Sequence, residues 1–239
     1  GATNNSFIHN TITLDGVYCV EGIIIGDESE GTIIKDNVLN ITSDAVVYGI
    51  YLEMSQKSTV DNNKLTLNSD SSIYGIQGFS SSDNIITNNN VNANAKAVYG
   101  LVFSNGNHNV IVDNNIAANG NSENITGRIK DAIKPGNAGI YLCANSTYNN
   151  IENNNITSKI GFAILVDDAA INNTIVNNYL KSEKGNANGA ISNSKGNIVS
   201  ENYINIAKEK EIVGLTVAEP MPRIAIRIKE MLNQLPLLK

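Results

Sequence analysis

The clearest pattern in the chain is an asparagine that recurs between two apolar positions. Each copy has an apolar residue three positions before the asparagine and another two positions after it, as in Ile151-x-x-Asn154-x-Ile156. A fixed period of about 20 to 50 residues is typical of repeat proteins. The pattern therefore predicts a stack of about eight similar units. Its copies are centred on Asn10, Asn37, Asn63, Asn89, Asn114, Asn154, Asn178 and Asn202, with spacings of 27, 26, 26, 25, 40, 24 and 24 residues.

A second pattern, a small residue followed by an aliphatic one, alternates with the first along the chain. In most copies another apolar residue follows two positions later, which is the alternation expected of a strand with one buried face. No helical stripe is long enough for a helical repeat. We therefore expect an all-β fold, a right-handed parallel β-helix over residues 1–218. The small residues are Gly22, Gly49, Gly75, Gly100, Gly139, Ala163, Ala190 and Gly214.

The repeated asparagine is expected to have a structural role. It lies between two inward apolar positions, so its amide should turn inward at a bend of the coil. A buried amide without a partner costs about 1 to 3 kcal/mol. Stacked asparagines avoid this cost by bonding to the turn backbone and to the asparagine of the next coil. The sequence thus predicts an asparagine ladder along the eight repeats.

The repeats resemble those of the pectate-lyase-like superfamily of parallel β-helix proteins. The copy Asn149-x-Ile151-x-x-Asn154-x-Ile156 is most similar to the Asn-rich versions in adhesin-like surface proteins of methanogenic archaea. The resemblance covers about residues 4–218. It implies the fold more firmly than the function, because this fold hosts lyases, hydrolases, esterases, adhesins and phage spikes.

Residues around the small-residue pattern suggest one exposed row and one buried row. Positions between the inward aliphatics should face solvent, where they could stack on sugar rings or pack against another chain. The alternative is that strands simply favour such residues. The candidate binding residues in this row are Ile24, Tyr51, Val102, Tyr141 and Leu165. The residues just before the small ones have inward parity and should form a buried aromatic stack, namely Tyr48, Tyr74, Tyr99 and Phe162.

Two segments depart from the repeat. An insertion from about residue 119 to 137 carries Arg128, Lys130 and Asp131. Long loops on rigid scaffolds often bind ligands, so this one is either a contributor to a ligand or partner surface or a tolerated excursion. Residues 219–239 contain little Asn and predict a short helical cap, with self-association or membrane-surface binding as alternatives.

Composition and charge limit the partners. Forty of the 239 residues are Asn, and the net charge is −6. Nucleic acids and anionic membranes need clustered Lys and Arg, so neither is expected to bind. No apolar stretch is long enough to span a membrane. The repeats already run at Gly1, which suggests a fragment excised from a longer protein.

Candidate catalytic chemistry is incomplete. Asp167 and Asp168 form an acidic pair, and residues 128–130 resemble the basic motif of polygalacturonases. Here, however, the basic motif precedes the acidic pair, which is the reverse of the family's order. Only His9 and His108 are histidines, and other outward acids fall on different coils. These acids are Glu53, Asp61, Asp83 and Asp113.

The two cysteines, Cys19 and Cys143, have no metal or redox spacing and are expected to be unpaired thiols or small buried hydrophobes.

The sequence favours a non-catalytic, adhesin-like domain at the cell surface or secreted. It would bind glycan or a surface protein, or serve as a stalk, with no cofactor and no metal. The alternative is a polysaccharide lyase or glycoside hydrolase of the pectate-lyase-like superfamily. A groove in which carboxylates and a basic residue converge would favour the enzyme.

Overall fold

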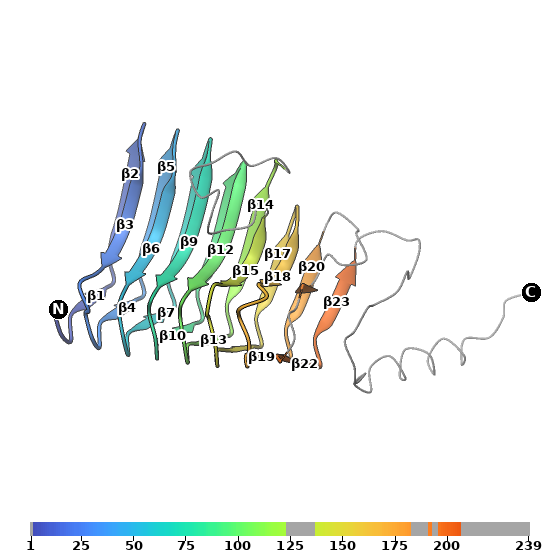
Figure 1. Ribbon diagram of the computed structural model, residues 1–239. Helices are drawn as coiled ribbons and strands as arrows, with labels where there is room; N and C mark the ends of the chain where they lie inside the picture. Colours follow the sequence, from blue (N-terminus) through green and yellow to red (C-terminus); the bar gives the residue numbers. More distant parts are fainter. Residues whose placement is uncertain (1, 123–136, 183–190, 193–195, 207–239) are drawn as a thin grey trace, which may run out of the picture.

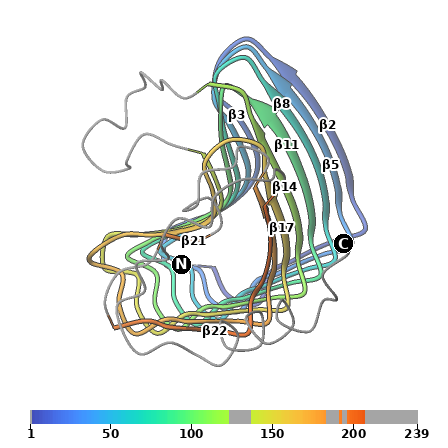
Figure 2. The ribbon, with the colours of Figure 1, turned by 90° about the vertical axis from the view of Figure 1, so that its right-hand side faces the viewer.

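The protein is a right-handed parallel β-helix, as the sequence predicts. The computed structural model describes residues 2–122, 137–182, 191–192 and 196–206. In this part the chain forms 23 strands, all in parallel ladders, and no helix. Figure 1 shows the coils stacked side by side along one axis. Figure 2 looks along that axis and shows three sheets as the walls of the coil.

Each coil contributes one strand to each sheet. Sheet 1 contains β1 (Ser6–Ile8), β4 (Ile33–Lys35), β7 (Thr59–Asp61), β10 (Ile85–Thr87), β13 (Val110–Val112), β16 (Asn150–Glu152), β19 (Thr174–Val176) and β22 (Ile198–Ser200). Sheet 2 contains β2 (Thr11–Gly16), β5 (Val38–Ser43), β8 (Lys64–Ser69), β11 (Asn90–Ala95), β14 (Asn115–Gly120), β17 (Asn155–Ser158), β20 (Tyr179–Ser182) and β23 (Tyr203–Ile206). Sheet 3 contains β3 (Val20–Ile25), β6 (Val47–Glu53), β9 (Ser72–Phe79), β12 (Ala97–Ser104), β15 (Ala138–Cys143), β18 (Phe162–Val166) and β21 (Ile191–Ser192).

Parallel register stacks the inward residues into continuous columns. One column of sheet 2 pairs each aliphatic residue with its equivalent in the next coil. Its six inner members are at most 1% exposed, so each removes its apolar surface from water. The column runs through Ile12, Leu39, Leu65, Val91, Ile116, Ile156, Leu180 and Ile204.

The asparagine ladder is confirmed along all eight repeats. At a typical rung, the side-chain oxygen of Asn89 accepts hydrogen bonds from the backbone N–H and the amide of Asn63, both at 3.0 Å. The Asn89 amide donates to the carbonyl of Val60 at 2.8 Å and to Asn114 Oδ1 at 3.0 Å. The same links continue from Asn10 to Asn202. The ladder thus satisfies its buried amides within the coil stack.

The bend that carries the ladder has a left-handed residue just before each asparagine. Asp36, Asn62 and Asn88 have φ values of 56°, 52° and 56°. Asn and Asp tolerate this conformation better than other residues with a side chain. Their recurrence therefore helps turn the chain from sheet 1 into sheet 2.

A second ladder, which the sequence analysis missed, lies at the corner between sheets 3 and 1. There Asn84, Asn109 and Asn149 repeat the same pattern, with the Asn109 amide 3.0 Å from Asn149 Oδ1. It continues through Asn173 to Asn197. Two of the three corners of the coil are thus held by stacked amides.

Two predicted segments fall outside the described residues. They are most of the insertion, including Arg128, Lys130 and Asp131, and the tail predicted to form a cap at 219–239. Within the described part of the chain, no helix could cross a membrane.

Candidate binding surface

The outer face of sheet 3 carries a stack of tyrosines that runs along the axis. The rings of Tyr48 and Tyr74 are stacked with centroids 5.0 Å apart, and those of Tyr74 and Tyr99 are 5.6 Å apart. Tyr141 continues the stack at 5.7 Å from Tyr99. We call these four residues the tyrosine column. Figure 2 shows that the sheet behind them is bent, so that its outer face is concave.

The predicted aromatic stack therefore exists, but its inward orientation was wrong. Val47 and Ile50 both belong to the inner core, whereas Tyr48 packs with the outer cluster and its ring lies 5.6 Å from that of Tyr51. Gly49 also faces inward, so two consecutive positions point into the coil and the strand alternation is broken there. If side-chain direction is assumed to alternate across the glycine, the prediction assigns the wrong face of the sheet to four residues: Tyr48, Tyr74, Tyr99 and Phe162.

A small residue, usually glycine, occupies this break because neighbouring coils approach closely. A Cβ on Gly75 would lie 2.4 Å from the carbonyl oxygen of Gly100 and 2.8 Å from a methyl group of Val91. A Cβ on Gly49 would meet the Gly75 carbonyl in the same way. The small-residue pattern thus reflects tight packing between coils at the bend of sheet 3.

The predicted binding row of this face was expected to be exposed, but only its first two members are accessible to solvent. The row consists of Ile24, Tyr51, Val102, Tyr141 and Leu165. Ile24 is 43% exposed and Tyr51 is half-buried. In contrast, Val102 and Tyr141 are fully buried, and Leu165 is 7% exposed. They form an outer hydrophobic cluster with the tyrosine column, so the expected exposure of these three was wrong. Ile24, Tyr51 and the half-buried Tyr48 remain accessible to a ligand, and we call them the open corner.

The open corner is acidic. Among the described strands of sheet 3, only Glu21 and Glu53 are charged. Burial raises the pKa of Tyr51 to about 12, and the negative charges of Glu53 and Glu21 contribute to the shift. Burial likewise raises the pKa of Tyr48. The phenols of the open corner are therefore neutral hydrogen-bonding groups at physiological pH.

The cysteines are both free, as expected, but differ in exposure. Cys19 is exposed, while Cys143 is buried beside the tyrosine column. Burial raises the pKa of Cys143 to about 11, which keeps it a thiol. The hydroxyl of Tyr141 lies 3.4 Å from Asp167 Oδ2, so one member of the acidic pair borders this outer cluster.

The outer face of sheet 2 is a polar surface that the sequence analysis did not single out. Asn115 donates to Asn90 at 3.2 Å, and Asn119 donates to Asn92 at 3.0 Å. Asn90, Asn92, Asn115 and Lys64 are among the residues that line a shallow hollow of about 270 Å³, together with Ala117. The signal available in the sequence was the recurrence of Asn and Thr at outward strand positions.

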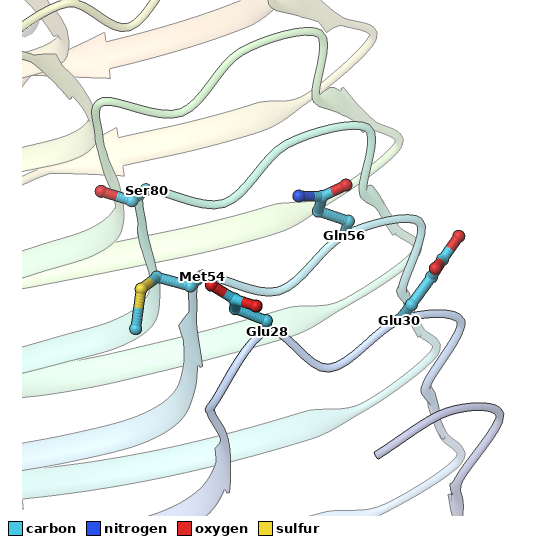
Figure 3. Close-up of a pocket in the computed structure, with 5 residues that line it drawn as sticks. All are labelled: Glu28, Glu30, Met54, Gln56 and Ser80. Atoms are coloured by element: carbon cyan, nitrogen blue, oxygen red, sulfur yellow. The ribbon is translucent and has the colours of Figure 1, made fainter. Parts of the chain in front are cut away.

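A larger hollow, of about 430 Å³, lies at the corner between sheets 3 and 1 (Figure 3). It is lined by Glu28, Glu30, Met54, Gln56 and Ser80, from three successive coils. Figure 3 shows that Glu30 points away from the other side chains, and it is paired instead with Lys57 Nζ at 2.5 Å. The carboxylates of this corner do not converge.

The remaining candidate chemical groups are dispersed. Asp61 is engaged by Lys35 Nζ at 2.6 Å and by the Asn88 amide at 3.0 Å. His108 stacks on Tyr148, and His9 Nε2 lies 3.8 Å from Asp36. Among the described residues, no three His, Cys, Asp or Glu side chains come together as metal ligands would.

Comparison with known proteins gives one family match and a group of structural neighbours. The family model described as "Periplasmic copper-binding protein (NosD)" matches residues 1–126. The periplasmic alginate epimerase AlgG has a TM-score of 0.52 at 17% identity, covering 80% of this chain and 52% of AlgG. A mutant of AlgG has a TM-score of 0.53 at 15% identity, covering 85% of this chain and 61% of the mutant. The A-module of the mannuronan C-5 epimerase AlgE6 of Azotobacter vinelandii has a TM-score of 0.50 at 13% identity, covering 85% of this chain and 58% of the module.

These likenesses confirm the pectate-lyase-like β-helix fold. At such identities they establish the fold alone. The chain spans about 52% to 61% of the length of these neighbours. No curated protein matches the chain in sequence. The predicted link to archaeal adhesins remains a prediction.

Proposed function

The chain belongs to the family of periplasmic copper-binding proteins (NosD), and we propose that it is a β-helix binding domain outside the cytoplasm that holds a neutral glycan at the open corner of sheet 3. The location follows the family description and the periplasmic alginate epimerase that shares the fold. Display at the cell surface, as in an adhesin, is the finer form of this proposal.

The observation that carries the proposal is the accessible aromatic corner. Tyr48 and Tyr51 place two rings 5.6 Å apart on a concave face, beside the exposed Ile24. Aromatic rings with a polar hydroxyl suit sugars, because the ring packs against the C–H face of the sugar and the hydroxyl bonds to its edge. The buried part of the tyrosine column holds these two residues in place, which limits the entropy lost on binding.

Charge selects the class of glycan. Glu21 and Glu53 flank the open corner, and the described strands of sheet 3 contain no Lys, Arg or His. A uronate polymer would bring carboxylates next to these glutamates, and like charges repel at such a site. A neutral polysaccharide avoids this repulsion.

The family description raises the question of copper, and the described residues do not fit it. Copper prefers imidazole, thiolate and thioether ligands. His9, His108, Cys19, Cys143 and Met54 are the described residues of these types. Among the described His, Cys, Asp and Glu residues, no group of three could hold a metal ion. The raised pKa of Cys143 also opposes the thiolate form that binds metal. We therefore assign no step to copper.

We propose binding in preference to polysaccharide cleavage. Cleavage needs a carboxylate or other base beside a group that stabilises developing charge. On sheet 3 the described charged groups are the two glutamates, and they lie on successive strands without a cation between them. The likeness to alginate epimerases is one of fold and does not favour an epimerase activity here.

The test is calorimetric binding of the 239-residue chain to neutral and uronate polysaccharides, namely a β-glucan, a mannan and alginate. We expect a neutral polymer to bind and alginate not to bind. Tyr51→Ala should weaken binding about tenfold, as expected for loss of one ring contact of about 1.4 kcal/mol. Tyr148→Ala, which removes an exposed tyrosine outside sheet 3, is the matched control and should bind as the parent does.

Two results would count against the proposal. The first is binding of alginate in preference to both neutral polymers. The second is equal binding by the parent and Tyr51→Ala. Product analysis of the same mixtures by mass spectrometry covers the alternative, because shortened or unsaturated chains would show an enzyme.

A further inference from the structure

One amide oxygen on the outer face of sheet 3 is buried without a hydrogen-bond donor. Among the described residues, only two buried side-chain nitrogen or oxygen atoms lack a partner, and they are Thr32 Oγ1 and Gln77 Oε1. Such atoms are rare in native proteins, because leaving them unpaired costs free energy. Thr32 is completely buried, whereas Gln77 is partly exposed. The Gln77 amide is therefore the one of the two that a ligand can reach.

Gln77 lies directly beside the open corner. The parallel register pairs Ile24 of β3 with Tyr51 of β6, and Tyr51 with Gln77 of β9. Paired strands are about 4.8 Å apart, so these three side chains are successive neighbours in one outward row. A ligand seated on the Tyr51 ring thus has Gln77 as its next neighbour along the axis.

The polar groups around this position accept more hydrogen bonds than they donate. Glu21 and Glu53 are carboxylates, and Gln77 adds an unpaired acceptor oxygen. The described strands of sheet 3 contain no Lys, Arg or His that would supply charged donors. A hydroxyl group donates one hydrogen bond, so a polyhydroxyl ligand provides the donors that this surface lacks. An ester or ether of the same hydroxyl has lost its donor.

We infer that Gln77 selects glycans with free hydroxyl groups at the open corner, with a sugar hydroxyl donating to Gln77 Oε1. The inference rests on the proposed glycan site and narrows its substrate class. The terminal torsion of a glutamine side chain is broad, so rotation of the amide turns Oε1 from its buried position toward a ligand on Tyr51. The bound glycan satisfies an acceptor that the unliganded chain leaves unpaired. O-acetylation removes the donor, so acetylated glycans bind more weakly.

The test compares a β-glucan and a mannan, each with free hydroxyl groups and after O-acetylation, by calorimetry with the parent chain and Gln77→Met. Methionine keeps an unbranched side chain and removes the amide. We expect the parent to bind the free form about fivefold to tenfold more tightly than the acetylated form, as one neutral hydrogen bond allows. Gln77→Met should bind the free form more weakly than the parent by the same factor, and should distinguish the two forms by less than about twofold.

A second measurement needs no ligand. Removing an unpaired buried acceptor removes the cost of its burial, so Gln77→Met should unfold at a higher urea concentration than the parent. A gain in stability with a loss of binding is typical of a functional residue. Gln56→Met is the matched control, because Gln56 is an exposed glutamine at the corner between sheets 3 and 1. It should change neither the binding nor the urea midpoint. Gln77→Leu repeats the test if Gln77→Met does not fold.

The outcomes separate this inference from the proposed function. Weakened binding by Tyr51→Ala together with parent-like binding by Gln77→Met would leave the glycan site in place and overturn the role of Gln77. Equal binding of the free and acetylated polymers by the parent would also overturn it. A lower urea midpoint for both Gln77→Met and Gln77→Leu would show that the amide stabilises the unliganded chain instead. A parent chain that binds neither polymer in either form would remove the proposed function and, with it, this inference.

Discussion

At the scale of single residues, the ladder asparagines stabilise the fold through both the oxygen and the nitrogen of the side-chain amide. Asn89 accepts from Asn63 and donates to Asn114, and it also donates to the carbonyls of Val60 and Thr87. Aspartate would lose the donor, and a smaller side chain would lose all these contacts. The identity of the residue is therefore fixed by the coils on both sides of it.

Asn89→Ala should destabilise the protein by roughly 2 to 4 kcal/mol. The reason is that the buried backbone N–H and side-chain amide of Asn63 both lose their acceptor. Urea unfolding followed by circular dichroism measures this. Asn92→Ala is the control, since Asn92 is exposed on sheet 2 and bonds to Asn119. Its effect should be within about 0.5 kcal/mol. Equal effects of the two substitutions would argue against a structural role for the ladder.

At the scale of elements, the break at the glycines divides sheet 3 between two hydrophobic clusters. The inner side of its strands joins the core, and the outer side forms the cluster that contains Tyr74, Tyr99 and Tyr141. The outer cluster gives this sheet a second buried face, which sheet 2 lacks. The open corner is the accessible end of that cluster.

Alkaline titration should reveal the outer cluster. Burial raises the pKa of Tyr51 from 10.0 to about 12 and raises that of Tyr74 as well. Because the folded pKa is above the unfolded one, the stabilisation is fully present below pH 10 and is lost as the pH rises through about 12. We expect tyrosine ionisation, followed by phenolate absorbance, to lag in the folded chain relative to the chain in denaturant.

Tyr74→Phe should raise the pH at which the chain unfolds, because this phenol no longer has to ionise. Tyr148→Phe, at an exposed position, should leave that pH unchanged. A folded chain whose tyrosines all titrate like those in denaturant would contradict the burial of the column.

At the scale of the whole molecule, the net charge and the few side chains that could bind copper contrast with the copper-binding description of the family. The net charge is −6, and the sequence contains two His, two Cys and three Met. Among the described residues, the His and Cys side chains form no group of three with one another or with Asp or Glu that could hold a metal ion. Acidic surface alone attracts cations but does not select copper.

We therefore expect the purified chain, loaded with copper and then dialysed, to retain far less than one equivalent of metal by atomic absorption. Cys19→Ser controls for chance binding of copper by the exposed thiol, and it should lower the amount of copper that remains after dialysis. Stoichiometric copper that survives dialysis in both proteins would contradict the assignment and point to a ligand set formed with residues beyond those described.

The sequence by itself determined the period, the strands, the inward columns and the ladder from Asn10 to Asn202. It could do so because stacking equal coils brings each residue onto its own equivalent, so a one-dimensional repeat specifies the three-dimensional neighbours. Side-chain parity along an unbroken strand then fixes which residues are buried, as for Leu39 and Ile41.

Only the tertiary structure decided which face the tyrosines occupy, how deeply Val102, Tyr141 and Leu165 are buried, and where the second ladder lies. Parity fails at Gly49 because the close approach of adjacent backbones breaks the alternation there. Burial on the outer face depends on the curvature of sheet 3, which brings Tyr48 and Tyr51 together across the bend. The tyrosine column and the second ladder do join equivalent positions of successive coils, but strand alternation alone does not show which way these positions point.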